Sequence, residues 1–213
     1  MKKRFFIPCI LFVCSFFLHA HPHVFIDNTV EFIWNGKDLR GAYVQWTFDS
    51  AFSSEIINWL DVNHDGKFDD EENRQVYDNA FINLRHYYYY TFMRQGSTRT
   101  NPPKVSEFKA TQKKGIMSYR FYIDLSSYKG NELYFAVYDY TYFCDIRYNE
   151  DGGIKLTYDP KQVKASFDII ENKDYPVFYD PLSPATDTSI YDRWKPGLQT
   201  YYPREIRIRW QSL

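Results

Sequence analysis

The sequence predicts a mainly β protein of the α+β class, an antiparallel β-sandwich or open barrel into which a helix–loop–helix hairpin is inserted. Three observations support this fold class. Apolar and polar residues alternate over most of the chain, as they do in strands with one buried face. After residue 104 the alternating segments are short and separated by turn sequences, which is typical of sandwiches and barrels. Between about 50 and 94, apolar residues instead recur at the helical period.

The first two strands are expected on either side of the dipeptide Asn35-Gly36. Apolar residues alternate with polar ones over 24–34 and again over 42–48. Asn-Gly favours the tight turns that join antiparallel strands, so these two segments should form a β-hairpin. Asn28 is the polar residue at an otherwise apolar position of the first strand.

Two helices are expected next, one beginning near Ser50 and a longer one from about 70 to 92. The paired prolines of the segment GSTRTNPP end the second helix, because proline cannot continue a helix. Strand patterns then fill 104–171. A Pro-rich tail at about 172–203 follows, and the alternating segment REIRIRW (204–210) is expected to return as a last strand.

Residues 1–20 have the layout of a secretory signal peptide: three basic residues, an apolar run and a small residue, Ala20, at the end. The apolar run is shorter than the roughly 20 residues that a membrane span needs. We therefore expect cleavage near Ala20, a single β-rich domain over 21–213 without a transmembrane segment, and a periplasmic or secreted location. Lipid attachment at Cys14 is the alternative.

Charge and cysteine content restrict the function. Removing residues 1–20 takes away three positive charges and changes the formal net charge from −1 to −4, and no basic block remains for nucleic acid. Cys144 would be the one cysteine left, inside a strand-like stretch, so we expect it to be buried and unreactive. No phosphate-binding loop, nucleophile elbow or cysteine–histidine pairing appears, which disfavours nucleotide enzymes and ordinary hydrolases.

The acidic segment DVNHDGKFDDEE (61–72) between the two helices matches the twelve-residue EF-hand calcium loop. Calcium takes about six to eight oxygen ligands, so short oxygen-bearing side chains must recur in a tight loop, and Gly66 permits its sharp reversal. The alternative is an acidic helix–helix loop without a ligand. Because the chain shows one such loop, we expect calcium to be structural. The candidate ligands are Asp61, Asn63, Asp65, Lys67 through its backbone carbonyl, Asp69 through a water, and Glu72.

His21 and His23 would stand at the mature terminus if cleavage follows Ala20. Neutral imidazoles suit zinc, nickel, cobalt and copper. Pro22 has no amide proton, which excludes the N-terminal site that uses deprotonated amides. The alternative is a solvated, frayed end. Further ligands would come from elsewhere in the fold, and the candidates are Asp27, Asp49 (also the expected cap of the first helix), His86 and Asp139.

The segments HPHVFID, WTFDSAFS, the acidic loop and VYDYTYF occur in an order that resembles the domain-of-unknown-function 1007 family. The resemblance implies a secreted bacterial protein linked to nickel, cobalt or zinc transport systems. It extends over the mature chain to about residue 170.

These observations together predict a non-catalytic periplasmic accessory protein of nickel, cobalt or zinc transport or homeostasis. His21 and His23 would bind the metal, calcium would hold the scaffold, and a membrane metal transporter would be the partner. One alternative is a copper enzyme in which His21 chelates through its amine and ring. Another is a calcium-stabilised β-sandwich that binds a partner protein or a glycan through its many aromatic side chains.

Overall fold

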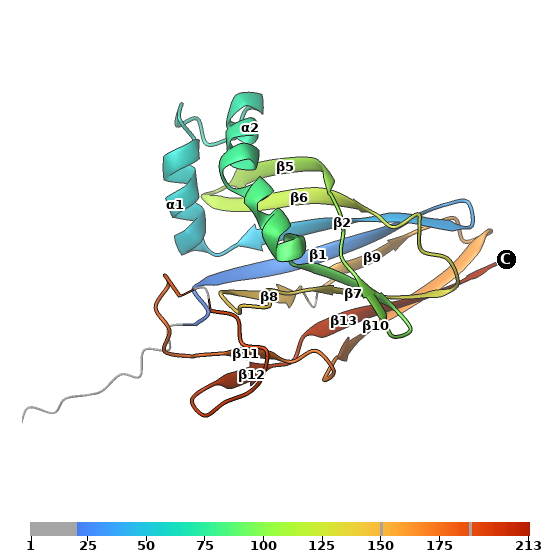
Figure 1. The fold of residues 1–213 in the computed structure, drawn as a ribbon. Helices are drawn as coiled ribbons and strands as arrows, with labels where there is room; N and C mark the ends of the chain where they lie inside the picture. Colours follow the sequence, from blue (N-terminus) through green and yellow to red (C-terminus); the bar gives the residue numbers. More distant parts are fainter. Residues whose placement is uncertain (1–20, 150, 188) are drawn as a thin grey trace, which may run out of the picture.

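The computed structural model describes residues 21–149, 151–187 and 189–213 (Figure 1). The expected signal peptide and Cys14 lie outside these ranges. Within them the chain is mainly β, as predicted, with most strands gathered into two large sheets and a helical region at one end. No helix in the described ranges is long and apolar enough to cross a membrane.

The first sheet contains six strands: five follow the order β5-β6-β2-β1-β8, and the sixth, β9, also pairs with β1. The predicted Asn35-Gly36 hairpin is confirmed: β1 and β2 pair antiparallel, and Gly36 adopts the positive φ of +62° that the turn requires. The strands are β1 (Val24–Asn35), β2 (Asp38–Phe48), β5 (Ser106–Lys113), β6 (Ile116–Asp124), β8 (Cys144–Tyr148) and β9 (Ile154–Thr157).

This sheet is not purely antiparallel, in contrast to the prediction. Strand β1 pairs parallel with both β8 and β9. The reason is topological: the chain leaves this sheet, contributes to the second one and returns along β1 in the same direction.

The second sheet has the strand order β10-β13-β7-β3-β4, and all its pairs are antiparallel. The predicted last strand is confirmed as β13, which lies inside this sheet between β10 and β7. The tail before it forms a small separate pair, β11 with β12. The strands are β3 (Thr91–Gln95), β4 (Thr98–Thr100), β7 (Glu132–Val137), β10 (Val163–Glu171), β13 (Arg204–Ser212), β11 (Val177–Tyr179) and β12 (Gln199–Tyr201).

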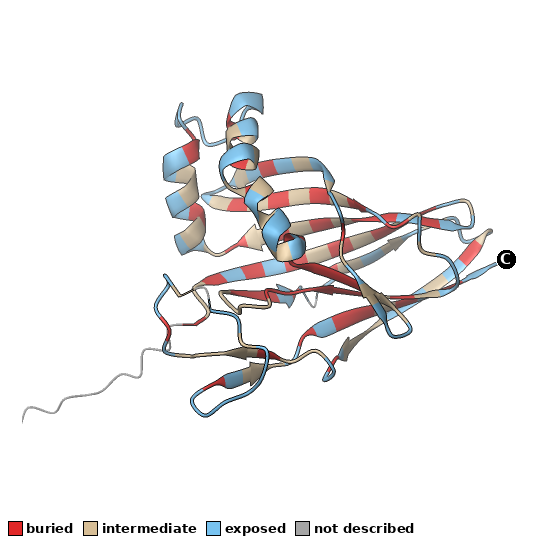
Figure 2. Ribbon diagram, in the orientation of Figure 1, coloured by how far each residue is buried: buried red, intermediate tan, exposed pale blue. Residues whose placement is uncertain are grey.

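The two large sheets share one hydrophobic core, and their arrangement is sandwich-like. The rings of Phe32 on β1 and Phe135 on β7 meet edge to face with centroids 5.3 Å apart, and both side chains are fully buried. Figure 2 shows buried residues alternating with more exposed ones along the strands. In the described part of the chain neither sheet closes into a barrel.

The helical region comprises α1 (Ser50–Leu60), α2 (Asp70–Asn79) and the 3₁₀ helix η1 (Phe81–Tyr90). The prediction of one continuous helix from 70 to 92 was therefore wrong after Asn79. At Ala80 the backbone leaves the helical conformation (φ −121°), and Phe81 turns into the core, with its ring 4.2 Å from that of Phe108.

Three consecutive tyrosines at the end of η1 adopt left-handed backbone angles: Tyr88 (φ +57°), Tyr89 (+49°) and Tyr90 (+52°). Each such residue costs on the order of 1 kcal/mol, because the Cβ atom approaches the following carbonyl oxygen. Burial offsets this strain, since Tyr89 and Tyr90 are both buried and the Tyr90 ring lies 5.7 Å from that of Trp46. Tertiary packing of aromatic rings thus overrides the helical period.

The helices are fixed to the first sheet by specific hydrogen bonds. Asp49 caps α1 as predicted, its Oδ1 accepting from the amides of Ala51 (2.9 Å) and Phe52 (3.0 Å). The buried Ser53 hydroxyl accepts from the Met117 amide at 3.0 Å. α1 packs against β6 and α2 packs against β5, and the acidic loop joins the two helices (Figure 1).

Candidate metal sites

The acidic loop between α1 and α2 is wound by hydrogen bonds from its own backbone. Asp61 Oδ2 accepts from the Gly66 amide (3.2 Å), Asn63 Oδ1 from the Asp65 amide (2.8 Å), and Asp65 Oδ1 from the Lys67 amide (2.9 Å). Gly66 has the positive φ of +79° that the predicted reversal needs. The loop spacing in the sequence therefore translates into a compact coil of oxygen-bearing residues.

Glu72, the last residue of the loop, is hydrogen-bonded to residues at the beginning of the loop. Its Oε2 accepts from the Asp69 amide (3.0 Å) while Asp69 Oδ1 accepts from the Glu72 amide (2.8 Å), which forms a capping box at the start of α2. Glu72 Oε1 accepts from the amides of Val62 (2.8 Å) and Asn63 (3.3 Å). Glu72 is buried, so the structure brings the last predicted ligand against the first residues of the loop.

Asp61 carries the observation that most directly concerns a cation. The residue is 3% exposed, and its Oδ1 is buried without a hydrogen-bond partner among the described residues. A desolvated carboxylate oxygen without a partner is unfavourable. The predicted metal ligands around it are carboxylate, amide and carbonyl oxygens, a set that fits a hard cation such as calcium.

The predicted ligands are nevertheless not drawn together as a coordination shell. In the ranges that the structure describes, no three His, Cys, Asp or Glu side chains are clustered closely enough to hold a metal ion. The Glu72 and Asp69 carboxylates instead accept hydrogen bonds from backbone amides. His64, within the loop, is exposed.

Gln112 on β5 also belongs to this site, although the sequence pattern did not identify it. Its Nε2 donates to Asp61 Oδ2 at 2.7 Å and to the Lys67 carbonyl oxygen at 3.2 Å. Gln112 lies far along the chain from the loop, and only the packing of the helices on β5 brings it here. No motif spacing contains this information.

His21 and His23 lie together at the start of β1. Their rings are edge to face with centroids 4.8 Å apart, and the His23 amide donates to the Phe143 carbonyl at 2.8 Å. His21 is 8% exposed and His23 is half-buried. The histidines are therefore packed against the fold, unlike the solvated, frayed end considered as the alternative.

Each of these two imidazoles keeps one nitrogen unpaired. His21 Nδ1 and His23 Nε2 are buried and have no hydrogen-bond partner within the described ranges. Burial lowers the pKa of His23, the neighbouring charge of His21 lowers it further, and a hydrogen bond with the Ser183 backbone opposes both effects. A lowered pKa keeps the His23 ring neutral near pH 7, which is the form that binds metals.

The Pro-rich tail lies next to this histidine pair, with the Tyr179 ring 6.4 Å from that of His21. Ser183 Oγ donates to Asp187 Oδ2 at 2.5 Å, and the Ser189 amide donates to Asp187 Oδ1 at 2.9 Å. The hydrogen bond from Ser183, those from Ser189 and the charge of His21 together lower the pKa of Asp187 to about 2, so this carboxylate is ionised at neutral pH. Sequence reasoning missed Asp187, because the tail shows no periodicity.

A cavity of about 280 Å³ adjoins the tail and the ring of Phe143, which lies 5.0 Å from that of His23. It is lined mainly by aromatic rings, a hydroxyl and a carboxylate. The lining residues are Tyr87, Tyr90, Thr141, Phe143, Ala185 and Asp187.

The four further ligands suggested by the sequence have other environments. Asp49 uses Oδ1 to cap α1 and Oδ2 to accept from the Phe25 amide at 2.9 Å. Asp139 is 1% exposed, and its oxygens accept from the amides of Thr141 (2.8 Å) and Cys144 (3.0 Å). Asp27 and His86 are exposed side chains.

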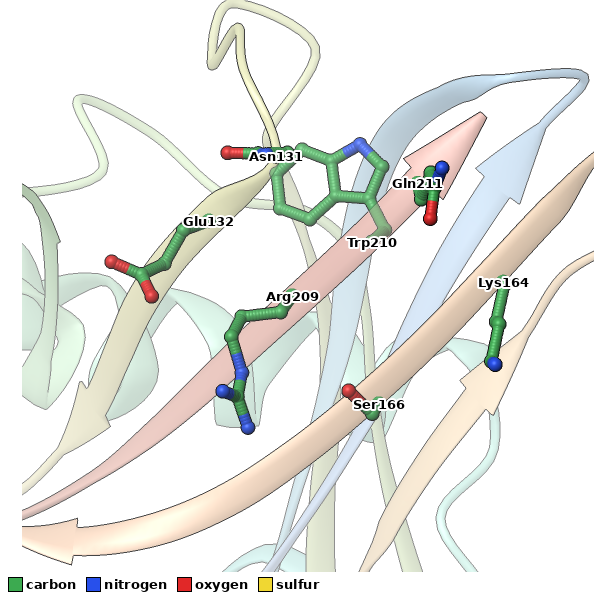
Figure 3. A pocket seen from close by; sticks show the side chains of 7 residues that line it. All are labelled: Asn131, Glu132, Lys164, Ser166, Arg209, Trp210 and Gln211. Atoms are coloured by element: carbon green, nitrogen blue, oxygen red, sulfur yellow. The ribbon is translucent and has the colours of Figure 1, made fainter. Parts of the chain in front are cut away.

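A broad hollow of about 610 Å³ lies on the second sheet, over β7, β10 and β13 (Figure 3). Its lining mixes acidic Glu132 with basic Lys164 and Arg209, and Arg209 is bound to Asp168 at 3.0 Å. None of the predicted ligands lines it, and we assign it no function.

Comparison with known proteins gives the family. Residues 6–210 match the family described as "Protein of unknown function (DUF1007)". The chain belongs to this family. The resemblance noted from the sequence segments is thereby confirmed, and it extends beyond residue 170 into the tail and the last strand.

Two curated relatives of this family member are uncharacterised proteins. One is an uncharacterized 15.5 kDa protein in the trpE 3′ region of Spirochaeta aurantia, 34% identical over 98 residues, which cover 45% of this chain and 70% of that protein. The other is an uncharacterized protein of Haemophilus influenzae, 27% identical over 148 residues, which cover 67% of this chain and 70% of that protein. Neither description names an activity.

Proposed function

We propose that this protein is a periplasmic metal-binding accessory protein of a nickel, cobalt or zinc transport or homeostasis system, with His21 and His23 as the metal ligands. One observation carries the proposal: the two imidazoles are in contact, and each holds one buried nitrogen without a partner. Leaving buried polar atoms unpaired costs about 1–3 kcal/mol each. A cation bound between the rings would satisfy both nitrogens.

The chemistry of the surroundings supports a divalent cation of borderline softness. Imidazole nitrogens suit zinc, nickel and cobalt, and the lowered pKa of His23 keeps that ring available. Asp187 is an ionised carboxylate whose charge interacts with that of His21, and it is our candidate third ligand. If cleavage follows Ala20, the amine of His21 would add a fourth donor.

The acidic loop would hold calcium in a structural role. Asp61 Oδ1 is the buried, unpaired acceptor that a cation would satisfy, and the loop joins α1 to α2 beside the first sheet. Extracellular EF-hand modules bind calcium with dissociation constants of about 10⁻⁴ to 10⁻³ M, which suits a compartment where calcium is plentiful. Calcium would stabilise the helical insertion and leave the transition metal to the histidines.

The remaining parts of the proposal rest on the sequence. The signal-peptide layout of residues 1–20 supports export, and the resemblance described above supports a membrane metal transporter as partner. A non-catalytic role is favoured over copper chemistry, because the other two described histidines, His64 and His86, are exposed on the helical insertion and no contact with His21 or His23 is seen for either within the described residues.

The test is metal analysis of the signal-processed protein after exposure to zinc, nickel and cobalt, with affinities measured by titration calorimetry. The double variant His21→Ala, His23→Ala should lose the bound metal. The matched control, His64→Ala with His86→Ala, removes the same number of imidazoles and should bind as the wild type does. Equal metal content in the His21/His23 variant and the wild type would disprove the proposal.

A further inference from the structure

Gln112 lies on β5, outside residues 61–72, but its side chain contacts the acidic loop. The side-chain nitrogen of Gln112 lies 2.7 Å from Asp61 Oδ2 and 3.2 Å from the Lys67 carbonyl oxygen. These two oxygens are the ligands that the motif assigns to its first and seventh positions. A hydrogen-bond donor thus occupies a position between two predicted calcium ligands.

The amide group of Gln112 can change from a hydrogen-bond donor to an oxygen ligand while its side chain stays in the site. The nitrogen and oxygen of a glutamine amide are nearly the same size, and rotation about the last torsion exchanges donor and acceptor. Without a cation, the donor faces the two oxygens. With a cation near Asp61, the positively polarised N–H₂ is repelled and the carbonyl oxygen is attracted, and calcium accepts Gln carbonyl oxygens as ligands.

A second observation on the same carboxylate points to a ligand. Asp61 is 3% exposed, and while Oδ2 receives the Gln112 amide and the Gly66 backbone, Oδ1 is buried without a partner in the described part of the chain. The Asp61 carboxylate, next to the Gln112 amide, therefore keeps one buried oxygen, Oδ1, to which no described hydrogen-bond donor is paired.

We propose that Gln112 is a calcium ligand supplied by β5, so that calcium clamps the helical insertion onto the edge of the six-stranded sheet. This inference rests on the proposed calcium site. Two residues before Gln112, on the same face of β5, the Ala110 amide donates to Asn73 Oδ1 on α2 at 2.7 Å. β5 is the edge strand of its sheet, and the contact with Asn73 pairs a backbone donor that the edge leaves open.

Two substitutions at this position distinguish a ligand from a purely structural side chain. Gln112→Leu removes the oxygen and should lower calcium affinity about tenfold, the size of one charge-assisted contact. Gln112→Glu replaces the amide oxygen with a carboxylate and should raise calcium affinity. In EDTA, both variants should melt at lower temperature than the wild type, because one loses two hydrogen bonds and the other faces Asp61 with a like charge.

The measurements are calcium titration calorimetry and thermal melting with calcium or EDTA. Gln211→Leu and Gln211→Glu, at an exposed position of β13, serve as matched controls and should change neither quantity. Gln112→Asn keeps the amide but shortens the side chain, and it should bind calcium as weakly as the leucine variant. Because this change is milder, it serves as a second test should the leucine or glutamate variant fail to fold.

The outcomes separate this inference from the calcium site itself. Wild-type protein that binds calcium while the leucine and glutamate variants bind equally well would refute the role of Gln112 and leave the loop site standing. A fall in affinity in both variants would make Gln112 a structural residue only. Wild-type protein that takes no calcium would overturn the loop site and the role of Gln112 together.

Discussion

Ser183 holds Asp187 beside the histidine pair: its Oγ donates to the carboxylate at 2.5 Å, while its backbone forms a hydrogen bond with His23. One buried serine in the tail thus contacts both the candidate third ligand and one of the imidazoles. The tail, which the sequence marks only by its prolines, thus lies next to the two histidines.

The first prediction concerns this carboxylate. Asp187→Asn removes the negative charge that faces His21, so zinc affinity should fall about tenfold. Asp192→Asn removes the same charge at an exposed position of the tail and should leave the affinity unchanged. Titration calorimetry with zinc measures both, and equal affinities for the two variants would show that Asp187 takes no part in binding.

The second prediction tests the calcium loop. Asp61→Asn removes charge from the buried, unpaired ligand and should weaken calcium binding by at least about tenfold. Calcium at a hundredfold excess over its dissociation constant should stabilise the wild type by about 2.7 kcal/mol and raise its melting temperature. Glu71→Gln alters an exposed carboxylate of the same segment that is not a motif ligand. If both variants lost the calcium response equally, the effect would be one of total charge and not of ligation.

The third prediction concerns the attachment of α2 to the edge strand. Asn73 Oδ1 accepts from the Ala110 amide at 2.7 Å, and Asn73 Nδ2 donates to the Phe68 carbonyl at 3.1 Å. Asn73→Ala should lower the free energy of unfolding by about 1–2 kcal/mol, since a partly buried amide loses its partner. Urea unfolding measures this, with Asn79→Ala, which breaks only a contact within α2, as the control. Equal losses would mean that the contact to β5 contributes nothing.

The fourth prediction is a pH dependence on the second sheet. Asp168 on β10 faces Arg207 on β13, and hydrogen bonds from Arg207 lower the pKa of Asp168 below its ordinary 3.8, with a smaller contribution from Arg209. A lowered pKa in the folded state stabilises the protein above pH 3.8, and this stabilisation is lost as the pH falls through the folded-state pKa.

Asp168→Asn should therefore reduce stability at pH 7 and make little difference well below pH 3.8, where the wild-type carboxyl is protonated as well. Urea unfolding at several pH values measures the difference between the two proteins. Because this ion pair is about one-third exposed, solvent screening keeps the difference at pH 7 within about 1 kcal/mol. A difference that is the same at every pH would contradict the assignment to charge.

The fifth prediction concerns Cys144, which was expected to be buried and unreactive. It is 7% exposed, its Sγ lies 3.9 Å from the Tyr90 hydroxyl, and burial raises its pKa well above the ordinary value. In the signal-processed protein, thiol reagents should react with Cys144 only after unfolding, because the thiolate is the reactive form. Colorimetric thiol titration with and without urea checks this, and rapid labelling of the folded protein would contradict it.

The sequence by itself determined the features that depend on local pattern. Alternation over 24–34 and 42–48 around Asn35-Gly36 was enough for the first hairpin, because side chains of a strand alternate between its faces. The change of period around residues 61–72 was enough to place a loop between two helices, and the position of Asp49 was enough for the cap of α1. The family could be named from short segments in order.

Only the tertiary structure decided which distant segments meet. The parallel pairing of β1 with β8, the end of α2 before Ala80, and the arrival of Gln112 and Asp187 at the two candidate sites all depend on contacts between residues far apart in the chain. Periodicity reports which face of an element is buried, but not what it is buried against. Which segments contact one another is decided by how the sheets, the aromatic rings and the tail pack around one core.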